Sequence, residues 1–187
     1  MEVRSVSTAF SDFVLAGCSL YVAWMVYNSS VYASWGFMGI ALAASFGVLK
    51  FGVVFPSFQP KVVRMHVIST WMASVLGIPL IAAGFCVYHH MPVTAKFYLV
   101  SSPVAMFLSI VHKPLEEKLT IIMSTLAVLG ILFVASTSLN IYATAGVLAY
   151  GFASAVKPTN FLGFPGIDWF HFILTGGNVL FMYGLIF

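Results

Sequence analysis

Four polar side chains stand at helical spacing in the last apolar segment of the chain. Asp168, His171, Thr175 and Asn178 follow one another at intervals of three, four and three residues. On an α-helix these intervals place all four side chains on one face. A carboxylate and an imidazole one turn apart are the residue types of catalytic sites and of zinc sites. We call this stripe the polar seam, and it is the first candidate for chemistry in the sequence.

Residues of the same types stand at the ends of other apolar segments. Asp12 and His66 begin the first and third segments, and His112 ends the fourth. In a bundle of seven antiparallel helices, these ends share the depth of Asp168. One hypothesis is therefore a zinc site made by His66, His112, Asp168 and His171, with an open position for water. Such a site would belong to a metal-dependent intramembrane lipid hydrolase acting from the cytoplasmic side.

The polar seam also has a structural interpretation, which the sequence favours. Polar groups that face acyl chains are costly, so the seam should face other helices. Intramembrane Ser, Thr and Asn side chains commonly hydrogen-bond between helices. The seven-helix membrane hydrolases related to alkaline ceramidases and progestin/adipoQ receptors carry His-x-x-x-His on the last helix, and here Thr175 stands in place of the second His. We therefore predict no catalytic residue and no cofactor, with zinc as the alternative.

The composition indicates an integral membrane protein. Of 187 residues, 61% are hydrophobic and 7% are charged, whereas about a quarter of the residues in soluble domains are charged. Apolar stretches of roughly 20 residues, the length that crosses about 30 Å of hydrocarbon, take up most of the chain. We expect a single transmembrane helical domain, residues 1–187. The net charge of +3 is too small and too scattered for nucleic-acid binding.

Seven apolar segments, each bounded by turn residues or charges, predict an all-α polytopic membrane protein. The gaps between the segments are short, so consecutive helices should run antiparallel in a bundle of seven transmembrane helices. The predicted segments are 10–27, 32–50, 66–88, 95–112, 118–136, 139–156 and 169–187.

Lysine and arginine residues orient this bundle, because positively charged residues prefer cytoplasmic loops. With seven helices, Lys96 alone falls on one side of the membrane. The others share the opposite side: Arg4, Lys50, Lys61, Arg64, Lys113, Lys118 and Lys157. The sequence thus predicts a cytoplasmic N-terminus and a C-terminus outside. Removing one segment from the count would flip every later loop and lose this partition.

Several apolar stretches of the sequence are familiar in combination. They read TWMASVLGIPLIA at 70–82, NIY at 140–142 leading into AGVL at 145–148, and FVLAG at 13–17 followed by SL at 19–20. Together they resemble the small multi-pass family that includes transmembrane protein 276. The resemblance implies a multi-pass membrane protein of undetermined activity and carries over no catalytic residue.

The sequence supports three functional hypotheses. The favoured one is a non-enzymatic bundle that binds a membrane lipid, a partner membrane protein or a second copy of itself. The second is the zinc-dependent lipid hydrolase. The third is a channel or facilitator for a small solute, lined by Ser102, Ser109, Thr175 and Asn178. The segment centres carry no charged residue, which argues against a proton-coupled carrier.

Overall fold

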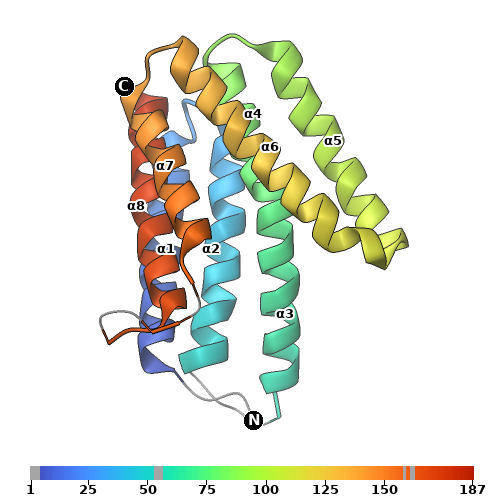
Figure 1. Cartoon of the computed structure of the whole chain (residues 1–187), viewed down its shortest axis with the longest axis vertical. Coiled ribbons are helices and arrows are strands. Elements are labelled where there is room, and N and C mark those ends of the chain that lie inside the picture. The colour runs from blue at the N-terminus through green and yellow to red at the C-terminus, as the bar shows by residue number, and fades with distance from the viewer. Residues whose placement is uncertain (1–4, 53–56, 158, 161–162) are drawn as a thin grey trace.

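The computed structural model describes residues 5–52, 57–157, 159–160 and 163–187, and the elements formed by these residues are helices (Figure 1). This confirms the predicted all-α class. The α-helices are α1 (Val6–Val26), α2 (Val31–Gly52), α3 (Gln59–Met72), α4 (Ile78–Tyr88), α5 (Pro92–Val111), α6 (Glu116–Thr137), α7 (Ile141–Ala155) and α8 (Gly166–Ile186). A π-helical turn, Ala73–Gly77, joins α3 to α4, and a 3-10 turn, Lys113–Leu115, precedes α6.

Each predicted segment coincides with one helical rod, although the ends differ. The third segment is the continuous rod formed by α3, the π-turn and α4. This rod begins at Gln59, whereas the predicted segment begins at residue 66. The prediction began too late because the first two turns of the rod are polar and carry no hydropathy signal. Pro60 lies in its first turn, where the missing N–H costs no helical hydrogen bond. Arg4, which contributes to the charge partition, lies outside the described residues.

Counted over the described residues, six rods are long and apolar enough to cross a membrane. The seventh rod, α7, has 15 residues. At 1.5 Å per residue, α7 extends about 22 Å, which is less than the ~30 Å of a hydrocarbon core. The six long rods indicate a multi-pass membrane protein on length and composition alone.

The rods alternate in direction along the long axis of the molecule, and α8 ends at the end opposite to the start of α1 (Figure 1). α1 packs along α2 and α8, α7 packs along α8, and α3 packs on α2. The α5–α6 hairpin contacts α4, and its far end leans away from α3 (Figure 1). The bundle is therefore dense around α1, α2 and α8, and its rods diverge between α3 and α6.

α2 crosses the α3–α4 rod in close backbone contact. A Cβ atom at Gly36 would lie 2.5 Å from the carbonyl oxygen of Gly77 and 2.6 Å from Cγ1 of Ile81. Small residues allow helices in membranes to approach in this way, and the resulting van der Waals contact is what holds them together. Gly77 ends the π-turn two residues before Pro79, and a proline without an N–H removes one helical hydrogen bond from the preceding turn.

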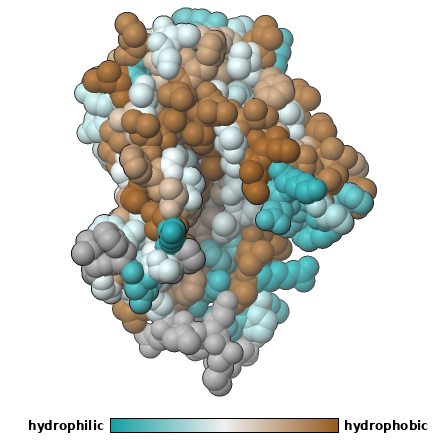
Figure 2. Space-filling view, viewed as in Figure 1, coloured by the Kyte–Doolittle hydropathy of each residue, from teal (hydrophilic) through white to brown (hydrophobic). Residues whose placement is uncertain are grey.

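Apolar side chains cover most of the surface seen in Figure 2, and hydrophilic ones gather at its lower end and at the α5–α6 turn. This turn holds Lys113, Glu116, Glu117 and Lys118, and Lys113 forms an ion pair with Glu116. An apolar band bounded by polar ends is typical of helical bundles that face lipid.

Candidate functional site

A cavity of 420 Å³ lies between α3 on one side and α6, α7 and α8 on the other. α1 and α2 form its inner wall, and its lining is mostly apolar, as at Leu15, Ile78 and Val128. Leu129 of α6 and Ile167 of α8 both line the cavity and are exposed at the surface. The cavity therefore opens through the side of the bundle, and Figure 2 shows a hollow in this face.

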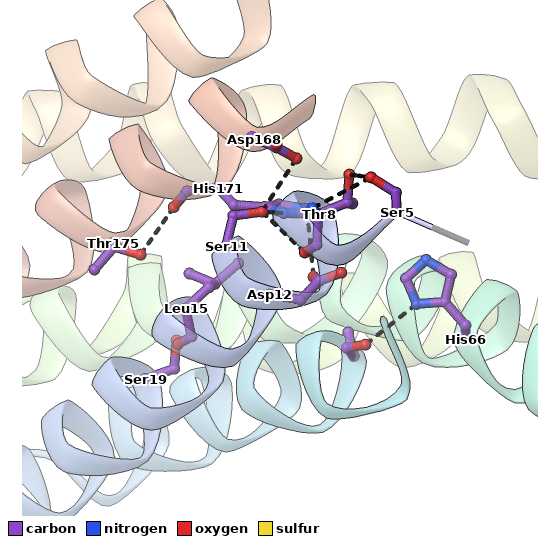
Figure 3. A network of polar contacts seen from close by, with 11 residues as sticks. Ser5, Thr8, Ser11, Asp12, Leu15, Ser19, His66, Asp168, His171 and Thr175 are labelled. Atoms are coloured by element: carbon purple, nitrogen blue, oxygen red, sulfur yellow. Dashed lines mark hydrogen bonds and ion pairs between the residues drawn. The ribbon is translucent and has the colours of Figure 1, made fainter. Parts of the chain in front are cut away.

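One corner of the cavity is polar and joins α1 to α8 (Figure 3). Asp12 and His171 line the cavity, and Nε2 of His171 lies 3.5 Å from Oδ1 of Asp12. Nδ1 of His171 lies 3.0 Å from the hydroxyl oxygen of Ser11, which also lies 3.4 Å from Oδ1 of Asp168. Ser11, Asp12 and Asp168 are each at most 1% exposed. We call these four residues the acid–imidazole cluster.

α1 and α8 form this cluster because they pack in parallel and begin at the same end of the bundle (Figure 1). Ser5 caps α1, its hydroxyl oxygen accepting a hydrogen bond from the N–H of Thr8, which sets where the helix begins. Asp168 lies in the first turn of α8, where the positive end of the helix dipole favours a carboxylate. The two helix starts therefore bring the acid and imidazole groups to one depth.

Gly47 of α2 leaves the space that the Asp12 side chain occupies. A Cβ atom added at Gly47 would lie 2.5 Å from the carboxyl carbon of Asp12 and would overlap its oxygens. Gly47 is itself buried. α2 therefore approaches α1 closely at the depth of the cluster, and a hydrogen atom is the largest side chain that fits there.

The cluster contains more acid than base. If both carboxyl groups are ionised, a protonated His171 balances one of the two negative charges from within the cluster. Oδ2 of Asp12 and Oδ2 of Asp168 accept no hydrogen bond from any described residue. Among the described residues that line the cavity there is no lysine and no arginine. The ammonium group of Lys50 lies outside this lining, 4.7 Å from the centre of the Phe51 ring, and its positive charge acts on the Asp12 carboxyl group. Because buried carboxylate oxygens without a hydrogen-bond partner are costly, this corner is suited to a hydrogen-bond donor or a cation.

A second set of polar contacts lies deeper along the same helices. Tyr150 of α7 donates a hydrogen bond to Oδ1 of Asn178 at 2.6 Å, and Nδ2 of Asn178 donates to the Ser19 hydroxyl oxygen at 2.9 Å. Ser19 donates to the carbonyl oxygen of Leu15. Asn178 is fully buried, and both ends of its amide group have partners. These bonds tie α1, α7 and α8 together.

The polar seam therefore divides between two roles. Asp168, His171 and Asn178 are buried and contact side chains of α1. Thr175 is half-buried and donates to the carbonyl oxygen of His171 in its own helix at 2.8 Å. Three of the four residues thus connect helices, and the hydroxyl group of the fourth bonds along α8.

The four residues of the zinc hypothesis lie at different places. Asp168 and His171 belong to the acid–imidazole cluster, and His66 lines the same cavity with Nδ1 3.3 Å from the carbonyl oxygen of Ala43. His112 follows the end of α5, is exposed and does not line the cavity. Within the described ranges, no group of three or more His, Cys, Asp or Glu residues is arranged to hold a metal ion. The zinc site stays a prediction.

The residues of the channel hypothesis do not line the cavity. Ser102 and Ser109 are buried in α5 and donate to the carbonyl oxygens of Tyr98 and Ala105 in the same helix. Thr175 and Asn178 lie outside the lining as well. The polar groups of these four side chains form hydrogen bonds within or between helices, and other residues line the cavity.

Sequence reasoning missed Ser11 and Gly47. A signal for Ser11 was present, because Thr8, Ser11, Asp12 and Ser19 share one face of the first helix: Ser11 and Asp12 follow Thr8 by three and four residues, and Ser19 follows Asp12 by seven. That stripe is the counterpart of the polar seam on α8. Gly47 carried no such signal, since its importance comes from the approach of another helix.

No protein-family model, curated protein or solved structure matches this chain. The predicted resemblance to the family that includes transmembrane protein 276 therefore stays a prediction. A function for the chain has to be inferred from the geometry of the cavity and of the acid–imidazole cluster.

Proposed function

We propose that this chain is a non-enzymatic, seven-span membrane protein that binds the polar end of a lipid in its lateral cavity. The observation that carries the proposal is the combination of one polar corner with apolar walls that open through the side of the bundle. A lipid has the same division into a polar end and an apolar chain. Ligand sites are commonly concave, mostly apolar and equipped with a few polar groups that fix orientation.

The depth of the cluster supports this assignment. His171 is five residues beyond the start of α8, so it lies about 8 Å along the helix axis from that start. With the N-terminus in the cytoplasm, as the positive residues favour, this depth is at the boundary between the headgroups and acyl chains of the cytoplasmic leaflet. A lipid headgroup could enter the polar corner sideways from that boundary.

The size of the cavity limits how much of a lipid it can hold. A volume of 420 Å³ is within the range of roughly 300–1,000 Å³ of small-molecule sites. The bound part is therefore a small headgroup and the first part of one chain, and the remaining chain extends through the opening.

Photocrosslinking with a hexadecanol that carries a diazirine on its chain tests this function, because the hydroxyl probe makes no assumption about headgroup charge. We expect crosslinks to peptides of α6 and α8 that line the cavity. Gly151→Leu should reduce them about tenfold, the effect of a loss of about 1.4 kcal/mol of binding. Gly151 lines the cavity, and a Cβ atom there meets open space.

Gly176→Leu is the matched control for this experiment. Gly176 is also an exposed helical glycine whose Cβ atom would meet nothing, but it does not line the cavity. This variant should crosslink like the unchanged protein. Equal labelling of all three proteins, with crosslinks confined to the outer faces of the helices, would overturn the proposed function.

A further inference from the structure

We propose that the ligand of this cavity is a lipid with a primary amine headgroup, and that Asp12 binds its ammonium group. The inference rests on the proposed function, since it names the class of lipid that the same cavity takes. It is carried by one side chain: Asp12 is 1% exposed, lines the cavity and has a carboxylate oxygen, Oδ2, with no hydrogen-bond partner among the described residues.

One of the two carboxylate oxygens of Asp12 lacks a hydrogen-bond partner among the described residues. Oδ1 of Asp12 lies 3.5 Å from Nε2 of His171, whereas Oδ2, on the side of Gly47, has no hydrogen-bond partner among the described residues. An ionised carboxylate only accepts hydrogen bonds, and an ammonium group only donates them. An ammonium group in the cavity would therefore supply a donor and an opposite charge to the Asp12 carboxylate, which lines the cavity. Charge-assisted hydrogen bonds of this kind are stronger than neutral ones.

The charged groups around the cavity decide which kind of headgroup it favours. Asp168 adds a second carboxylate behind Ser11, and the described lining residues include no lysine or arginine. A phosphate or carboxylate headgroup would meet two acids at this corner and no lysine or arginine in the described lining, since Lys50 acts on Asp12 from outside it, and this disfavours an anion. A neutral hydroxyl headgroup could donate a hydrogen bond to Asp12 but would bring no positive charge to the two acids.

Neighbouring residues hold the Asp12 carboxylate in one position. Gly47 of α2 lies against the Asp12 carboxyl group on one side, and His171 of α8 holds it on another. His171 is itself held by Ser11 through Nδ1. The carboxylate is thus fixed before a ligand arrives, and a fixed acceptor loses little freedom on binding.

The hydroxyl groups of the lining extend this chemistry. Ser74, Ser124 and Ser154 line the cavity with Asp12. The hydroxyl groups of Ser74 and Ser124 donate to the carbonyl oxygens of Thr70 and Thr120, one turn earlier. The two serine hydroxyl oxygens can therefore still accept a hydrogen bond. A primary ammonium group carries three N–H donors, of which Asp12 takes one. We therefore favour a primary amine over a quaternary ammonium group, which donates no hydrogen bond.

The experiment is competition against the diazirine-bearing hexadecanol by three lipids of equal chain length: hexadecylamine, hexadecanol and hexadecyl phosphate. We expect hexadecylamine to compete about tenfold more strongly than hexadecanol, and hexadecyl phosphate to compete least. Asp12→Asn, which keeps the size of the side chain beside Gly47, should abolish the preference for the amine. Hexadecyltrimethylammonium, added as a fourth competitor, should be weaker than hexadecylamine.

Asp168→Asn is the control for a general loss of the cluster. Asp168 belongs to the same cluster but does not line the cavity, so this variant should keep most of the amine preference. Equal competition by amine and alcohol, or an amine preference that survives Asp12→Asn, would overturn the inference. The crosslinks of hexadecanol and their loss in Gly151→Leu would still stand in that case. Loss of those crosslinks in every protein would instead overturn the proposed function itself.

Discussion

At Gly47 a side chain is absent because the Asp12 carboxyl group occupies its space. Gly47→Ala should therefore push the carboxyl group away from its position or force α1 and α2 apart. We expect the free energy of unfolding to fall by about 1–3 kcal/mol, as is typical of overpacked cores. Thermal unfolding in dodecyl maltoside micelles measures this change, and the amine competition should weaken in the same variant.

Gly17→Ala is the control for this prediction. Gly17 is an exposed residue of α1, and a Cβ atom there meets no atom within 4 Å. This variant should unfold at the same temperature or somewhat higher, because alanine is favoured over glycine in helices by up to about 1 kcal/mol. If Gly47→Ala is as stable as Gly17→Ala and keeps its amine preference, the close contact with Asp12 has no energetic importance.

Three of the four residues of the acid–imidazole cluster could be named from the sequence, Asp12 by its depth and Asp168 and His171 by their spacing. The spacing of Asp168 and His171 placed them on one helix face, and the cost of burying polar groups in lipid turned that face inward. Their partner Ser11 is 160 residues away from His171 in the chain. Local spacing contains no information on which helix packs beside which, so this pairing needed the structure.

Among the elements, the contact between α2 and the π-turn is the one whose packing can be tested most directly. Gly36→Ala would place a methyl group 2.5 Å from the Gly77 carbonyl oxygen, and the two backbones would have to separate. We expect a loss of about 1–3 kcal/mol of stability, measured by the same thermal unfolding. Lipid binding at the proposed site should weaken as well, because α2 and the α3–α4 rod both line the cavity.

Gly39→Ala separates this contact from a general effect of alanine on α2. Gly39 lies one turn later, and a Cβ atom there would be 4.0 Å from the Cα atom of Gly77, which is an ordinary contact. This variant should keep its stability. Equal destabilisation by both substitutions would mean that α2 is sensitive to alanine for another reason.

The positions of the elements were largely predictable, and their details were not. Apolar runs located all seven rods because a helix that faces lipid must be apolar over most of its length. Hydropathy could not show that α3 starts at Gln59, since those first turns are polar. It also could not show the π-turn at Ala73–Gly77, which is a matter of hydrogen-bond register within a run of uniform hydropathy.

On the scale of the whole molecule, two departures from a regular bundle produce the cavity. The α5–α6 hairpin leans away from α3 (Figure 1), and α7 has 15 residues where the other apolar rods have at least 20. The space between these elements is where the polar corner meets the outside of the bundle. The short α7 is thus part of the proposed site, so its placement in the membrane bears directly on the proposed function.

The topology can be tested with single cysteines at helix ends, in a background that carries Cys18→Ala and Cys86→Ala. If all seven rods cross, Asn28 and Ser138 lie on the same side of the membrane, and α7 alone separates Ser138 from Lys157. In sealed vesicles with the cytoplasmic face outward, an impermeant maleimide should label Phe58→Cys and Lys157→Cys. It should label Asn28→Cys and Ser138→Cys only after detergent is added.

α7 decides this experiment, because its helix of about 22 Å must cross a core of about 30 Å. Hydrophobic mismatch of this size can be met by local thinning of the bilayer at a modest cost per ångström. Packing of α7 along α8 and the hydrogen bond from Tyr150 to Asn178 hold it among the long rods, so we expect it to cross. Labelling of Ser138→Cys together with Lys157→Cys would show that α7 does not cross. Labelling of Asn28→Cys and Ser138→Cys alone would indicate seven crossings in the reverse orientation.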